Sequence, residues 1–97
     1  MKNVTVTEVP ADAQLIDVRE PDEFAEVHAR GAVNVPLSEF MERHGEIDDT
    51  QPVYVICKSG GRSAQAAQYM EGALGMEDVI NVEGGTQAWV RSGLATE

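Results

Sequence analysis

The sequence predicts a three-layer α/β domain in which a mostly parallel central sheet carries helices on both faces. Short runs of β-favouring residues alternate along the chain with helix-forming stretches. Short connections between such segments are typical of a parallel sheet with covering helices. The length of 97 residues is close to the common size of one domain. We therefore expect a single domain over residues 1–97.

The first part of the chain predicts two strands and a helix. Valine alternates with threonine at residues 4–6, which favours a short first strand or an edge segment, and residues 15–18 are an apolar run of strand length. A helix should begin at Pro21, because proline is favoured at the first helical position and acidic residues suit the first turn. Gly31 is expected to end this helix.

The next segments predict a strand, a short helix and a loop. Residues 32–35 are a short β-favouring run that ends before a proline. Residues 38–42 favour a short helix or helical turn, with Ser38 as its capping residue. The polar residues 45–51 then predict a loop.

The second half of the chain contains the strongest strand prediction. Residues 53–56 (VYVI) are four consecutive β-favouring residues, as expected of a buried parallel strand. Residues 57–62 contain two glycines and predict a loop, and residues 63–70 are rich in helix formers. Residues 79–82 predict another strand, and residues 86–90 predict a last helix.

Charge and cysteine content limit the function classes that fit this chain. The net charge is −10, from 17 acidic and 7 basic residues. An acidic surface repels phosphate backbones and anionic lipids, which argues against nucleic-acid and membrane-surface roles. No apolar run approaches the roughly 20 residues of a membrane helix, and no apolar leader segment is visible. With a single cysteine, which excludes an internal disulfide, these features favour a cytoplasmic protein.

The single cysteine, Cys57, lies beside the few basic residues of its part of the sequence. Between Arg43 and Arg91 the only lysine and arginine are Lys58 and Arg62. A loop between a strand and a helix directs several N–H groups to one point, where they stabilise a thiolate or a bound anion. A cysteine after an apolar strand is commonly just a small buried residue. The neighbouring cations and glycines favour a reactive thiol instead.

Four segments, in order, resemble the signatures of single-domain rhodaneses and together span most of the chain. The first two are residues 15–24 (LIDVREPDEF) and 28–37 (HARGAVNVPL). Residues 57–63 (CKSGGRS) are similar to the active-site loop of this family, and residues 82–89 (VEGGTQAW) are similar to its closing signature. The resemblance implies the rhodanese fold over the whole chain.

The resemblance also implies sulfur transfer through a persulfide on Cys57. A sulfane sulfur from thiosulfate or another persulfide donor would pass to a thiophilic acceptor, cyanide or a cellular thiol. The implied partners are thus a small anionic donor and an acceptor, or a protein sulfur donor or acceptor, with no metal, organic cofactor, nucleic acid or membrane. Two departures from the family pattern, Val27 where glycine is common and Ala29 where isoleucine is common, lie outside the loop. The residues expected to bind the donor are Lys58, Ser59, Gly60, Gly61, Arg62 and Ser63.

Other polar residues are expected to have structural roles. In the family pattern His28 is structural rather than a general base for Cys57. Asp17 and Arg19 follow an apolar strand, and we expect them to brace the fold as a hydrogen-bonded charge pair. His28, His44 and Cys57 are too widely spaced in the sequence to indicate a metal site.

Two other functions use the same fold. A phosphatase or arsenate reductase is disfavoured because the related phosphatases place five residues between cysteine and arginine, whereas four separate Cys57 from Arg62. The shorter loop suits a single sulfur better than a tetrahedral phosphate, and a reductase would need a second thiol. A rhodanese-like regulatory or protein-binding module without turnover commonly lacks the cysteine, which this chain retains.

Overall fold

A computed structural model describes all residues, 1–97, and contains a five-stranded sheet in which every neighbouring pair of strands is parallel. The strand order is β1-β5-β4-β2-β3, which places β4 at the centre of the sheet. The predicted α/β architecture with a parallel sheet is therefore confirmed. The strands are β1 (Lys2–Val4), β2 (Gln14–Asp17), β3 (Val33–Asn34), β4 (Val53–Ile56) and β5 (Val79–Val82).

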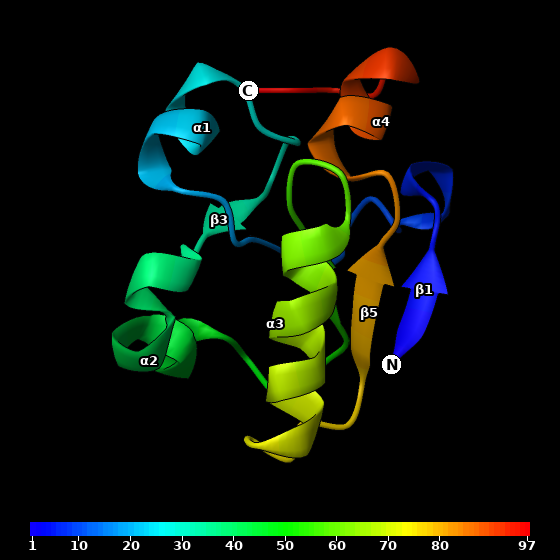
Figure 1. Cartoon of the computed structure of the whole chain (residues 1–97). Coiled ribbons are helices and arrows are strands. Elements are labelled where there is room, and N and C mark those ends of the chain that lie inside the picture. Colours follow the sequence, from blue (N-terminus) through cyan, green and yellow to red (C-terminus); the bar gives the residue numbers. More distant parts are fainter.

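Helices cover both faces of the sheet, and their apolar residues form two clusters. On the face that carries α3 in Figure 1, Met70 of α3 and Phe40 of α2 pack in one cluster with Val55 of β4. The other cluster joins Trp89 of α4 to Ile56 of β4. Because adjacent strand residues point to opposite faces, the two clusters lie on opposite sides of the sheet. The helices are α1 (Pro21–Glu26), α2 (Phe40–Arg43), α3 (Gly61–Gly72) and α4 (Gly85–Arg91). None of them has both the length and the apolar character needed to cross a membrane.

The first strand lies earlier in the chain than the sequence pattern predicts. β1 ends at Val4, and Val6 instead begins a 3₁₀ turn over Val6–Glu8. Val6 is buried in the same cluster as Trp89, and the Thr5 N–H donates to Glu8 Oε1 at 2.8 Å. The chain therefore leaves the sheet before Val6, because the Val6 side chain packs into the apolar cluster that contains Trp89.

The segment around α2 is more helical than predicted. Two 3₁₀ turns, Leu37–Glu39 and His44–Glu46, flank α2. The first residues of the loop expected at 45–51 therefore belong to the second turn. Ile47, which follows the second turn, is buried and packs in the cluster on the α3 side. The prediction that Ser38 caps a helix is wrong, because Ser38 lies inside the first turn. Its hydroxyl donates instead to Glu20 Oε1 at 2.6 Å.

Candidate active site

Cys57 lies directly after β4, at the carboxyl edge of the parallel sheet. Residues 57–60 connect β4 to α3, and they form the green arch above the start of α3 in Figure 1. Ligand sites of open α/β sheets are found at this edge, beyond the carboxyl ends of the strands. The arrangement of strand, cysteine, loop and helix is therefore the one that the sequence predicted.

The first turn of α4 holds the backbone of this loop. The Thr86 N–H and hydroxyl both donate to the carbonyl oxygen of Cys57, at 2.8 and 3.0 Å, and the Gln87 N–H donates to the carbonyl oxygen of Lys58 at 3.0 Å. Gly85 has φ of +57°, and a Cβ at this position would lie 2.5 Å from the Cys57 carbonyl oxygen. A glycine is therefore required where α4 meets the loop.

Hydrogen-bond donors surround the Cys57 thiol. The residue is 1% exposed, and its Sγ accepts from the Gly60 N–H at 3.1 Å and from the Ser63 hydroxyl at 3.3 Å. Burial is the largest single influence on the pKa of the Cys57 thiol and raises it. Hydrogen bonds from the Ser63 hydroxyl and from the N–H groups of Ser63, Gly60 and Ser59 outweigh burial and lower this pKa below its usual value. The hydrogen bonds therefore stabilise the thiolate relative to an ordinary cysteine.

The two cations near Cys57 do not have the arrangement that the sequence suggested. Arg62 belongs to the first turn of α3 rather than to the loop, and its Nη1 and Nη2 donate to the Glu23 carboxylate at 2.8 and 2.9 Å. These hydrogen bonds lower the pKa of Glu23 to about 2. Lys58 is exposed at the rim of the loop. Hydrogen bonds, rather than Lys58 and Arg62, are thus the main cause of the lowered pKa of Cys57.

The two loop glycines differ in what they contribute. Gly60 has φ of +113°, in the left-handed region that favours glycine, and a Cβ there would lie 3.4 Å from the Gly84 nitrogen. Gly61 is the first residue of α3, and a Cβ there would meet no atom within 4 Å. The expectation that both glycines shape the loop is therefore corrected, because only Gly60 does. The backbone N–H groups in the first turn of α3, from Gly61 onward, have no helical carbonyl oxygen before them to which they could donate.

Asp17 and Arg19 form the predicted charge pair. Both are buried, and Arg19 Nε and Nη2 donate to the Asp17 carboxylate at distances of 2.9 to 3.1 Å. Arg19 Nη2 also donates to the Val27 carbonyl oxygen at 2.7 Å, which ties the end of α1 to the sheet. His28 Nδ1 lies 2.8 Å from the Phe24 carbonyl oxygen, and the two rings are stacked. These contacts of His28 agree with a structural role.

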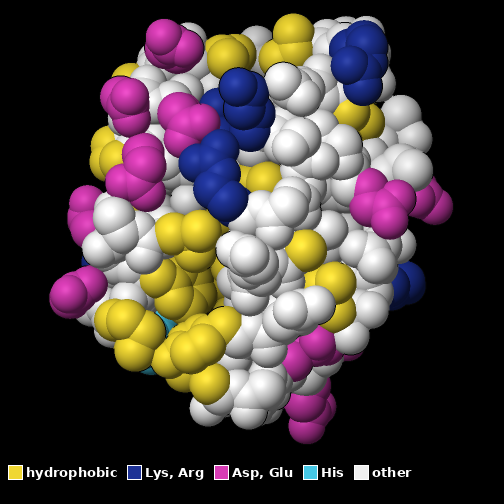
Figure 2. All heavy atoms as spheres, viewed as in Figure 1, with side chains coloured by type: hydrophobic (Ala, Val, Ile, Leu, Met, Phe, Trp, Pro, Cys, Tyr) yellow, Lys and Arg dark blue, Asp and Glu magenta, His cyan; other side chains and the backbone are white.

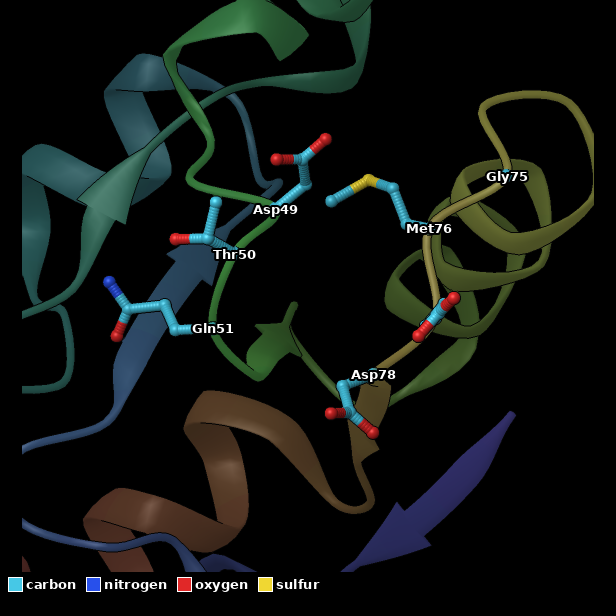
Figure 3. Close-up of a pocket in the computed structure, with 7 residues that line it drawn as sticks. Asp49, Thr50, Gln51, Gly75, Met76 and Asp78 are labelled. Atoms are coloured by element: carbon cyan, nitrogen blue, oxygen red, sulfur yellow. The ribbon is translucent and has the colours of Figure 1, made fainter.

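A separate hollow lies at the opposite edge of the sheet from Cys57. It is lined by Asp49, Thr50 and Gln51, which precede β4, and by residues 75–78, which precede β5. In Figure 3 the side chain of Met76 extends toward Asp49 across this hollow. Because the strands are parallel, the hollow is at their amino ends, and none of the residues predicted for the active site line it.

The surface around the start of α3 combines basic, acidic and apolar side chains. Figure 2 shows dark blue side chains near the start of α3, magenta side chains over α1, and a yellow patch between α2 and α3. Leu37, Phe40, Met41 and Tyr69 line the groove under this patch. The start of α3 thus carries basic side chains beside the acidic side chains of α1, on a protein whose net charge is −10.

The structure brings three further residues to the site that the sequence analysis did not single out for it. Glu23 binds Arg62, Thr86 binds the Cys57 carbonyl, and Asn81 of β5 accepts a hydrogen bond from Ser63 at 2.5 Å. Asn81 carried a usable signal, because an amide inside an apolar strand needs buried hydrogen-bond partners. Glu23 and Thr86 carried none, since each is separated from its partner by many residues.

Known proteins share both the sequence and the fold of this chain. The uncharacterized protein YqhL of Bacillus subtilis (strain 168) is 44% identical over 92 residues, covering 92% of this chain and 72% of that protein. The thiosulfate sulfurtransferase GlpE of Vibrio cholerae is 42% identical over 88 residues, covering 88% and 79% of the two chains. The crystal structure of SSP1007 from Staphylococcus saprophyticus superposes with a TM-score of 0.83 at 34% identity, covering 98% of this chain and 99% of that one. A family model described as a rhodanese-like domain matches residues 6–92, and with this match the chain belongs to the rhodanese-like domain family.

Proposed function

We propose that this protein is a sulfurtransferase that carries the transferred sulfur as a persulfide on Cys57. The Cys57 thiolate attacks the outer sulfur of thiosulfate, and a new S–S bond forms as the S–S bond of the donor breaks. Sulfite leaves with the electron pair of that bond. The persulfide anion and sulfite together carry the charge of the thiolate and thiosulfate, so the step needs no oxidant, reductant or cofactor.

A thiophilic acceptor completes the proposed cycle. A thiolate acceptor attacks the outer sulfur of the Cys57 persulfide and leaves as a new persulfide, whereas cyanide leaves as thiocyanate. In either case the Cys57 thiolate is regenerated with its electron pair. The acceptor in the cell is a small thiol or a thiol on a partner protein, and a reducing cytoplasm keeps Cys57 available for the reaction.

The observation that carries the proposal is the set of hydrogen bonds to Cys57 Sγ. The Gly60 N–H and the Ser63 hydroxyl lie 3.1 and 3.3 Å from this sulfur and support the thiolate without a neighbouring base. The outer sulfur of a persulfide is also anionic, and the N–H groups of Gly61 and Arg62 at the start of α3 suit it. The name of the similar Vibrio protein, thiosulfate sulfurtransferase, supports the same chemistry.

The remaining loop residues are proposed to bind the donor. Lys58 and Arg62 would attract an anionic donor to the loop, and the backbone of Ser59 would contribute an N–H to the sulfur. The Arg62 guanidinium is already held by Glu23, so Lys58 is the cation with more freedom to move toward a donor.

The test is to incubate the reduced protein with thiosulfate and to measure its intact mass. We expect the wild type to gain the mass of one sulfur atom and to lose it when cyanide is added. Cys57→Ser should fold normally and gain none, because the chain has no other thiol. If neither thiosulfate nor glutathione persulfide adds sulfur to the wild type, the proposal is wrong and a binding module without turnover becomes the better interpretation.

A further inference from the structure

Asn81 is a buried polar residue at the centre of an otherwise apolar strand. It lies on β5, between β1 and β4 in the sheet, and is 4% exposed. Val79 of the same strand packs in the cluster on the α3 side, and residues two apart in a strand share a face, so Asn81 points toward α3. Burying an amide is costly unless it forms hydrogen bonds, so its contacts indicate why it is there.

The amide of Asn81 joins the Cys57 loop to the start of α3. Its Oδ1 lies 2.5 Å from the Ser63 hydroxyl oxygen, and its Nδ2 donates to the Gly60 carbonyl oxygen at 3.4 Å. Nδ2 also donates to Oδ1 of Asn3 on β1 at 3.1 Å. Gly60 and Ser63 supply the donors that lie 3.1 and 3.3 Å from Cys57 Sγ. Asn81 therefore contacts both without touching the thiol itself.

The Ser63 hydroxyl has one proton and three acceptors within reach. These are Asn81 Oδ1 at 2.5 Å, the Gly60 carbonyl oxygen at 3.2 Å and Cys57 Sγ at 3.3 Å. A hydroxyl donates one hydrogen bond at a time. The Ser63 hydroxyl stabilises the Cys57 thiolate only when this proton points at Sγ, so the group that sets the direction of the proton affects the acidity of the thiol.

We propose that Asn81 is a positioning residue that holds the Ser63 hydroxyl proton away from Cys57 Sγ and thereby limits the stabilisation of the Cys57 thiolate by Ser63. When Cys57 is a thiol, Ser63 donates to Asn81 Oδ1 at 2.5 Å. When Cys57 ionises, the Ser63 proton turns to Sγ, 3.3 Å away, and the hydrogen bond to Asn81 Oδ1 is given up. The Asn81 amide itself stays in place, because its Nδ2 donates to Asn3 Oδ1 and to the Gly60 carbonyl oxygen. No covalent bond is broken, and no proton leaves Ser63.

This inference goes beyond the proposed sulfur transfer, because it concerns the ionisation of Cys57 whatever reagent the thiolate attacks. Other charged groups also face the thiol or lie next to it. Arg62 and Lys58 flank it on α3 and the loop, Glu23 of α1 binds Arg62, and the buried Asp17–Arg19 pair lies at the end of β2. Substitutions at Asn81 and Ser63 leave all of these charges in place, so their effects report on hydrogen bonding.

A double-mutant cycle tests the inference. The readout is the pH midpoint of the rate of alkylation of Cys57 by iodoacetamide, followed by intact mass, in the wild type, Ser63→Ala, Asn81→Ala and the double variant. Ser63→Ala should raise the midpoint by about 1–2 pH units, the usual effect of losing one hydrogen bond to a charged group. Asn81→Ala should lower the midpoint, because the Ser63 proton is then free to point at Sγ, and the double variant should resemble Ser63→Ala, because Asn81 acts through Ser63.

Two further variants separate positioning from a general loosening of the fold. Asn81→Val keeps a branched side chain suited to a strand and should lower the midpoint as Asn81→Ala does. Val79→Ala truncates a neighbour on the same strand and face, and it should lower the urea midpoint of unfolding without changing the alkylation midpoint. The inference is overturned if Asn81→Ala leaves the alkylation midpoint unchanged or raises it. It is equally overturned if the shifts of Asn81→Ala and Ser63→Ala add in full in the double variant.

Discussion

Replacing Glu23 with glutamine should lower the free energy of unfolding at neutral pH. The same replacement should have little effect in acid, where Glu23 is protonated. The Glu23 carboxylate accepts two hydrogen bonds from Arg62, at 2.8 and 2.9 Å, and a third from the Glu20 N–H at 3.1 Å. The contact joins α1 to the first turn of α3, across 39 positions of sequence. Glu23→Gln removes the charge while retaining the size and one acceptor oxygen of the side chain.

The magnitude follows from the pKa of Glu23. The Arg62 hydrogen bonds lower this pKa from 4.5 to about 2, and a shift of that size corresponds to at most about 3 kcal/mol. The side chains of Arg62 and Glu23 are 36% and 29% exposed, so solvent screening reduces the contribution. We therefore expect Glu23→Gln to lower the free energy of unfolding by about 1–2 kcal/mol at pH 7. Because the folded-state pKa is depressed, the contribution is complete above pH 4.5 and is lost as the pH falls toward 2.

Urea unfolding at pH 7 and at a series of values down to about pH 2.5 measures this effect. Asp22→Asn is a matched control, since it removes a neighbouring exposed carboxylate in the same helical turn. The difference between wild type and Glu23→Gln should exceed that for Asp22→Asn at pH 7 and shrink with acid. An equal difference at all pH values, or one no larger than the control, would refute the assignment of stability to the Glu23–Arg62 pair.

Two other predictions concern the loop. Lys58→Ala and Arg62→Ala should each lower kcat/KM for thiosulfate by roughly 5- to 150-fold, the effect of about 1–3 kcal/mol of lost charge contact. Urea unfolding should show that only Arg62→Ala also destabilises the fold, because it removes the partner of Glu23. Gly85→Ala should lower the free energy of unfolding by about 2 kcal/mol or more, because its φ is +57° and its Cβ would collide with the loop backbone. Gly61→Ala, at an open helical position, should unfold at nearly the wild-type urea concentration, and equal stability of the two alanine variants would contradict this reasoning.

Several parts of the fold follow from local sequence alone. The run of β-favouring residues at 53–56 corresponds to β4 without any shift, because a strand buried on both faces requires consecutive apolar residues. Pro21 begins α1 as predicted, since its fixed φ suits a first helical turn. The strand at 53–56 places Cys57 at the carboxyl edge of the sheet, so the sequence alone predicts the position of the candidate site.

Tertiary structure decided how the environment of Cys57 acts on it. The sequence places Lys58 and Arg62 next to the thiol, and from that proximity we expected charge to lower its pKa. In the structure, Arg62 is held by Glu23, and the Ser63 hydroxyl and backbone N–H groups lower the pKa of Cys57 instead. Proximity along the chain does not give the direction of a side chain or of a backbone N–H, and partners far apart in sequence leave no local pattern. The sequence therefore singles out Cys57 as the proposed nucleophile, and the contacts of α3 with α1 and β5 determine which hydrogen bonds and charges surround its thiol.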